Sequence, residues 1–201
     1  ADLKARELQN WLGERMGDTS LIEANPIFRA ELVAFLGDRS SGPRREAIRD
    51  WMAALRSSSR YQNVLLVDDA GKVVLALDGP YPVIGSEGLA QIRAARVHKK
   101  SGISDLHRSA NVAPIHLDIV VPLLAADTVR GFILLRIDPS GFLYPLIQSW
   151  PTPSPTAETL LVKREGNSVL FLNELRHRKG TAMKMRLPIS PELPAAQAVQ
   201  G

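Results

Sequence analysis

The fold is decided by residues 103–139, ISDLHRSANVAPIHLDIVVPLLAADTVRGFILLRIDP. This stretch predicts three successive strands, of which the last two are long, alternate in polarity and meet at a tight turn at residues 126–127. An earlier hairpin is predicted over 61–77, YQNVLLVDDAGKVVLAL, because Asp and Gly in its middle favour a turn. A helical segment over 86–100 separates the two blocks. Together they predict one antiparallel sheet.

Three amphipathic helices are expected ahead of the first strand. The first occupies residues 1–16 and ends near Gly17. The second begins at Asn25-Pro26, where asparagine supplies an N-cap and proline suits the first helical turn, and it ends at Gly37. The third begins near Gly42. Helices placed in this order are expected to cover one face of the sheet.

A proline-rich segment predicts a division of the chain. Residues 150–155, WPTPSP, favour an extended linker, and a second hairpin with a short strand follows it. We therefore expect an N-terminal helical segment over 1–40, a first α+β module over 41–150 and a second, incomplete module over 151–201. So short a second module buries little surface of its own.

Composition excludes several classes of function. The chain has 201 residues, a net charge of +4 and no cysteine, so disulfides, thiolate metal sites and cysteine nucleophiles are ruled out. Basic residues are scattered, which argues against nucleic-acid binding. No apolar run reaches the roughly 18–20 residues that cross a bilayer. Catalytic motifs such as a P-loop, Gly-x-Ser-x-Gly or HExxH are missing, so we expect no enzyme and no cofactor.

Polar side chains inside the predicted meander are the main candidates for a site. His116 and Asp118 point to one face of their strand, since side chains alternate, and Asp105 and His107 share a face of the preceding strand. A turn near Asn111 would set His107 opposite His116 and Asp105 opposite Asp118. Cross-strand Cβ atoms lie about 4.5–5.5 Å apart. The four side chains would then line a polar ligand pocket.

Two other interpretations of this group stay open. It could hold a borderline metal such as zinc, or it could be a solvent-facing sheet surface with paired charges. Tyr81 in the Gly-Pro-Tyr-Pro loop could cover a pocket, and Arg93 and Arg96 on the following helix could bind an anionic ligand. We count these three residues with the ligand-binding candidates and assign no metal ligands.

The order of elements and several segments resemble a known family. NVLLVDDAGKVVLAL (63–77), SDLHRS (104–109), PIHLDIVVPL (114–123), LLRIDPSGFLYPLIQSW (134–150) and MRLPIS (185–190) look like the periplasmic sensing regions of bacterial signalling proteins with tandem PAS-like, or double Cache, domains. In that family the second module is normally longer than the segment after Pro155. The Tyr/Arg/Trp pattern of its amino-acid-binding members is not found here.

The resemblance implies a fold and a role. The fold would be an α+β, PAS-like antiparallel sheet flanked by N-terminal helices, with a second, partial PAS-like module. The role would be small-molecule sensing outside the cytoplasm by a homodimeric receptor, tethered to the inner membrane through segments outside this chain. A histidine kinase of a two-component system or a cyclic-di-GMP enzyme would provide the output. The alternative is a structural or dimerisation module that binds no ligand.

Overall fold

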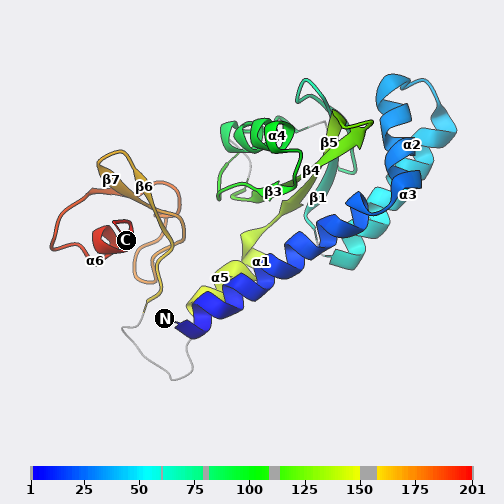
Figure 1. Cartoon of the computed structure of the whole chain (residues 1–201). Helices are drawn as coiled ribbons and strands as arrows, with labels where there is room; N and C mark the ends of the chain where they lie inside the picture. Colours follow the sequence, from blue (N-terminus) through cyan, green and yellow to red (C-terminus); the bar gives the residue numbers. More distant parts are fainter. Residues whose placement is uncertain (1, 60, 79–81, 109–113, 150–157, 201) are drawn as a thin grey trace. The chain divides into compact units, whose positions relative to one another are not determined.

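The computed structural model describes residues 2–59, 61–78, 82–108, 114–149 and 158–200. The chain forms two compact units, Ala1–Pro139 and Ser140–Gly201, and each is described by itself (Figure 1). The proline-rich linker predicted over 150–155 lies outside the described residues, so the three-part division remains a prediction.

The first unit begins with three helices, α1 (Asp2–Glu23), α2 (Pro26–Gly37) and α3 (Gly42–Ser59). The predicted start of α2 is confirmed, because the Asn25 side chain accepts a hydrogen bond of 3.0 Å from the backbone N–H of Phe28. The predicted end of α1 near Gly17 is wrong. One glycine costs a helix only about 1 kcal/mol relative to alanine, and burial of Ile22 beyond it favours continuation.

The sheet of the first unit has five antiparallel strands in the order β2-β1-β5-β4-β3. Their bounds are β1 Asn63–Asp68, β2 Val73–Ala76, β3 Gly102–Ile103, β4 Leu117–Ala125 and β5 Thr128–Ile137. The predicted turn between β4 and β5 is confirmed: Ala126 and Asp127 have φ of 46° and 64°, as a tight two-residue hairpin turn requires. The first meander strand is shorter than predicted, and an isolated bridge at His107 follows it.

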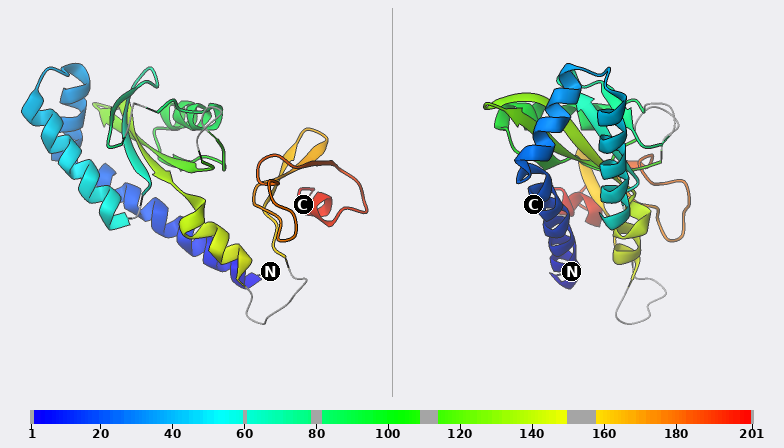
Figure 2. Two further views of the ribbon diagram at one scale, coloured as in Figure 1. Left: turned by 180° about the vertical axis from the view of Figure 1, so that it is seen from behind. Right: turned by 90° about the vertical axis from the view of Figure 1, so that its right-hand side faces the viewer.

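Helices cover both faces of this sheet (Figures 1 and 2). Helices α1 and α2 contact β4, and α3 contacts β1. Helix α4 (Ser86–His98) contacts β3 and β4 on the opposite face, where Ile92 and Ala95 pack in one buried cluster with Val120. Because side chains alternate along a strand, residues 116 and 118 point to the same face as Val120. They therefore lie under α4.

The second unit is a small three-stranded antiparallel sheet with short helices. Its strands follow the order β6-β7-β8. The predicted hairpin at residues 166–167 is confirmed, with Gly166 at φ 60°. The elements are a 3₁₀ turn at Pro139–Gly141, α5 Leu143–Gln148, β6 Val162–Glu165, β7 Ser168–Phe171, β8 Arg186–Pro188 and α6 Pro194–Ala198. Among the described residues of both units, none of the helices combines the length and apolar character that a membrane span needs.

Candidate functional site

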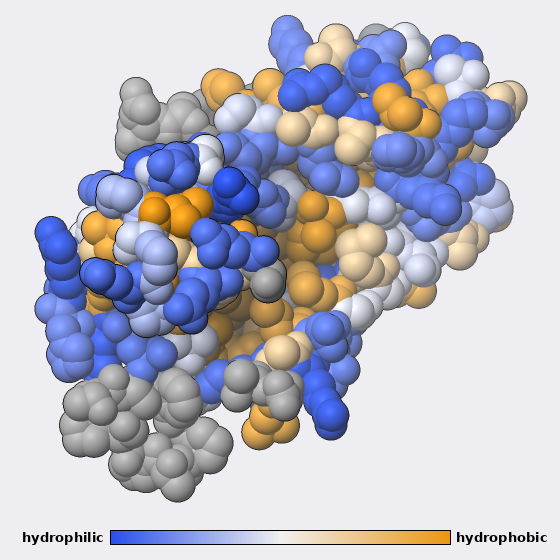
Figure 3. Space-filling view, turned by 60° about the vertical axis from the view of Figure 1, so that its left-hand side comes forward, coloured by the Kyte–Doolittle hydropathy of each residue, from blue (hydrophilic) through white to orange (hydrophobic). Residues whose placement is uncertain are grey.

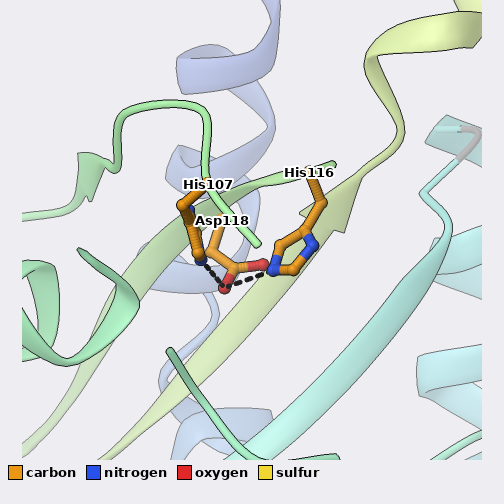
Figure 4. A group of neighbouring side chains, drawn as sticks. All are labelled: His107, His116 and Asp118. Atoms are coloured by element: carbon orange, nitrogen blue, oxygen red, sulfur yellow. Dashed lines mark ion pairs between the residues drawn. The ribbon is translucent and has the colours of Figure 1, made fainter. Parts of the chain in front are cut away.

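His107, His116 and Asp118 meet in the first unit, beneath α4 (Figure 4). Their exposed fractions are 0%, 1% and 0%. The predicted pairing of the two histidines is confirmed: each backbone N–H donates to the carbonyl of the other at 2.9 Å. The Asp118 Oδ2 atom lies 3.6 Å from His107 Nε2 and 3.9 Å from His116 Nε2. The solvent-facing interpretation of these residues is therefore wrong.

Backbone contacts fix which nitrogen of each imidazole carries the proton. His107 Nδ1 lies 2.9 Å from the carbonyl oxygen of Asp105, and His116 Nδ1 lies 2.8 Å from that of Pro114. A carbonyl oxygen only accepts hydrogen bonds, so each Nδ1 carries a proton and donates. In a neutral ring the lone pair is then on Nε2. Both lone pairs point toward the same oxygen of Asp118.

Arg136 belongs to the cluster and was missed in the sequence. It lies opposite Asp118 in the register of β4 and β5, where it is 6% exposed. Its Nε donates to Oδ1 of Asp118 at 2.9 Å and its Nη2 donates to Oδ2 at 3.0 Å. A signal was available, because Arg136 is the single charged residue in the apolar stretch GFILLRI of residues 131–137. A charge in such a strand requires a buried partner.

Burial and neighbouring groups shift the pKa values of the three side chains in different directions. Burial opposes ionisation of Asp118, but the side chains of His107 and Arg136 outweigh it and lower the pKa of Asp118 to about 2. Burial lowers the pKa of His116 to about 4. Burial acts in the same direction on His107, but the Asp118 carboxylate, the Asp105 carbonyl and the charge of Glu87 raise its pKa. At neutral pH, Asp118 is charged and His116 is neutral.

The first turn of α4 closes over the cluster. A Cβ atom at Gly88 would lie 3.2 Å from Oδ2 of Asp118 and 3.7 Å from Nε2 of His107. The same Cβ would lie 2.7 Å from the Ile84 side chain, so glycine suits the close approach of the helix backbone at this point. Glu87, in the same turn, is the residue whose negative charge acts on His107. The first turn of α4 therefore lies directly next to the cluster.

Ser104 takes the place that the sequence analysis gave to Asp105. The backbone N–H of Ser104 donates to the carbonyl of Asp118, and the N–H of Asp118 donates to the Ser104 hydroxyl, both at 2.9 Å. The prediction that Asp105 lies opposite Asp118 is thus wrong. The register slips by one residue between Ser104 and His107, so Asp105 is exposed, and its carbonyl oxygen accepts from His107 Nδ1.

Arg93 and Arg96 are exposed on α4 and do not join the cluster. The guanidinium of Arg96 donates to the carbonyl of Asp69 and lies 5.6 Å from the centre of the Phe132 ring, so it ties α4 to the β1–β2 turn. Tyr81 lies outside the described residues. A ligand-binding role for any of these residues, and for the cluster, remains a prediction.

Comparison with known proteins identifies the fold. No protein-family profile matches the sequence, and no curated protein matches it. The sensor domain of the V. cholerae histidine kinase DctB superposes with a TM-score of 0.57 at 15% identity, over 75% of this chain and 56% of that one. The ligand-binding domain of the Pseudomonas fluorescens chemoreceptor CtaA, in complex with L-isoleucine, superposes with a TM-score of 0.57 at 13% identity, over 92% of this chain and 68% of that one. The ligand-binding domain of the Pseudomonas aeruginosa amino acid chemoreceptor PctB, in complex with L-Arg, has a TM-score of 0.56 at 13% identity, over 92% of this chain and 70% of that one.

The likeness concerns the arrangement of helices and strands, since identity is low. The chain spans only 56% of the DctB sensor domain and about two thirds of the two chemoreceptor domains. All three share with it an α+β architecture, as the sequence analysis predicted. The chain therefore has the fold of the Cache-like sensor domains of histidine kinases and chemoreceptors.

Proposed function

We propose that this chain is an extracytoplasmic ligand-sensing domain of a bacterial transmembrane receptor. The observation that carries the proposal is the buried polar cluster of His107, His116, Asp118 and Arg136 beneath α4. Apolar residues of similar volume are often as stable or more stable at such positions. Stability alone therefore gives little reason to bury these groups. The three solved structures compared above are sensor or ligand-binding domains, which supports a role without catalysis.

The sensing mechanism would be a shift between two arrangements of α4. A Cβ atom at Gly88 would lie only 3.2 Å from Asp118, so we expect a ligand that changes the distances or charges among these side chains to act on the helix as well. A ligand shifts such an equilibrium only by its difference in affinity for the two states. Relay of that change across the membrane, a periplasmic location and a tether outside this chain belong to the same proposal.

A second candidate function is a dimerisation module that binds no ligand. It is favoured by apolar side chains on the surface of the N-terminal helices: Leu3, Leu21 and Ile27 are 61%, 71% and 79% exposed. Figure 3 shows one face of the molecule, on which apolar residues form orange patches among blue polar ones. Homodimerisation through α1 and α2 is compatible with sensing, so the two functions differ only in whether a ligand binds.

A thermal-shift screen separates these candidates. The purified chain is heated with carboxylates, amino acids, polyamines, nucleobases or divalent metals. A ligand at 100 times its dissociation constant adds about 2.7 kcal/mol to the stability of the folded state, which is a readable shift in Tm. The proposal predicts at least one stabilising ligand whose effect is lost in His116→Gln and kept in His177→Gln, an exposed control. A well-folded dimer that no compound stabilises would favour the dimerisation module.

A further inference from the structure

We propose that His107, His116 and Asp118 bind a divalent transition-metal ion of the zinc class. The inference deepens the proposed function by naming a ligand for the same site, and it rests on that function only for its link to signalling. No organic molecule can touch side chains that are 0–1% exposed without a rearrangement. A bare metal ion needs space only between the three donor atoms.

The distances among the donors are close to those of a tetrahedral site. Zinc binds histidine nitrogen and carboxylate oxygen at about 2.0–2.2 Å, which separates neighbouring donors by roughly 3.3–3.6 Å. Here one donor atom from each residue lies within 4.8 Å of the others, and Asp118 Oδ2 is 3.6 Å and 3.9 Å from the two Nε2 atoms. The two distances to the carboxylate oxygen exceed the tetrahedral spacing by only a few tenths of an ångström.

The surroundings of both imidazoles match those of metal ligands. Metal-binding histidines almost always donate the other ring N–H to a carbonyl or carboxylate, which fixes the tautomer and aims the lone pair. His107 and His116 both do this, through Nδ1 to the carbonyls of Asp105 and Pro114. The rings come from two segments that bridge each other through their backbones. The two Nε2 atoms are therefore held in place before any ion arrives.

A second observation concerns one of the two imidazole nitrogens that face Asp118. Nε2 of His107 is buried and has no hydrogen-bond partner. A buried polar atom left unsatisfied costs about 1–3 kcal/mol. In the neutral ring this atom turns a lone pair toward the Asp118 carboxylate, and the two lone pairs repel each other. A cation between the two atoms, either a proton or a metal ion, removes this conflict.

Donor chemistry selects the class of metal. Two imidazoles and one carboxylate suit zinc and its first-row neighbours, whereas calcium and magnesium prefer oxygen alone. Arg136 also binds the carboxylate, and its positive charge opposes a second cation nearby. We therefore expect reversible binding, as a sensor needs. Three protein donors also leave a coordination position for water or an anion.

Calorimetric titration of the tag-free, chelator-treated chain with zinc sulfate tests the inference. We expect one site per chain, with no comparable heat from calcium or magnesium. His107→Gln and His116→Gln should each weaken binding by at least about 100-fold, because each removes one of only three donors. A matched control, the double variant of the exposed residues His98 and His177, should bind zinc within about twofold of wild type.

A measurement on the wild type protects the test against unfolded variants. On addition of zinc, the imidazole ¹⁵N resonances of His107 and His116 should shift, while those of His98 and His177 stay in place. Absence of zinc binding by the folded wild-type chain, or zinc binding that persists in both buried variants, would overturn the inference. If zinc did not bind but another compound stabilised the chain, the metal inference would fail and the sensor proposal would stand. Zinc binding without any change in α4 would overturn only the link to signalling.

Discussion

Removing Arg136 tests how strongly the buried cluster depends on its paired charges. In Arg136→Met the Asp118 carboxylate, which is fully buried, loses two hydrogen bonds and its main counter-charge. Breaking a buried ion pair on one side costs about 3–5 kcal/mol, because an uncompensated charge stays behind. With a urea m-value of about 2 kcal/mol/M, the midpoint of unfolding would fall by roughly 1.5–2.5 M.

Urea unfolding in the presence of a chelator measures this loss. A Trp150→Phe background limits the fluorescence signal to Trp11 and Trp51, which both belong to the first unit. The matched control is Arg56→Met, since the bridge from Arg56 to Asp78 has side chains 33% and 61% exposed. Exposed pairs contribute about 0–1 kcal/mol.

A double-mutant cycle identifies the cause of the loss. Arg136→Met combined with Asp118→Asn removes both charges together. The summed losses of unfolding free energy in the two single variants should therefore be about 1–3 kcal/mol larger than the loss in the double variant. If Arg136→Met cost no more than Arg56→Met, or if the two effects added without coupling, Asp118 would not depend on a buried counter-charge and the reasoning would fail.

Three further predictions concern the same unit. The pKa of His116 is near 6.5 in the unfolded chain and about 4 in the folded chain. Between pH 6.5 and 4.5 the unfolded state therefore binds the proton and the folded state does not, so acidification lowers the free energy of unfolding by about 2–3 kcal/mol. Urea midpoints across this range should fall less steeply in His116→Gln, whereas equal slopes would contradict the burial argument. Gly88→Ala places a Cβ 2.7 Å from a neighbouring side chain and should lower the free energy of unfolding by about 1–3 kcal/mol. Gly17→Ala, whose Cβ meets nothing within 4 Å, should raise it by up to about 1 kcal/mol. If chemical denaturation gave the reverse order, the close approach of α4 would be refuted. Asp105→Asn, at an exposed position, should leave zinc affinity within about twofold of wild type in calorimetry, and a loss like that of His116→Gln would place its carboxylate in the site.

Local signals were enough to predict the sheet. The hairpin over 61–77 and the paired strands up to residue 137 follow from alternation of apolar residues and from turn residues, and the structure forms both. The N-cap at Asn25 was equally local, because asparagine is a preferred N-cap and the proline after it suits the first helical turn. These features depend on neighbours within a few residues, which a single sequence displays.

The composition of the cluster depended on register and could be predicted only in part. The pairing of His107 with His116 follows from a turn near Asn111, but the slip that seats Ser104 against Asp118 has no sequence signature. Burial of these residues was left open because no local pattern shows that the helix over 86–98 packs on this face of the sheet. The continuous burial of β4 on both faces arises from tertiary packing and not from its local pattern.

The central claim is that ligands act on this chain through the buried cluster beneath α4. Amide hydrogen–deuterium exchange of the whole chain, with and without saturating zinc or another stabilising ligand from the screen, tests it most directly. The account predicts slower exchange concentrated in residues 86–98, 102–108 and 114–118. Protection confined to residues 158–200, or unchanged exchange in α4 on binding of a stabilising ligand, would contradict it.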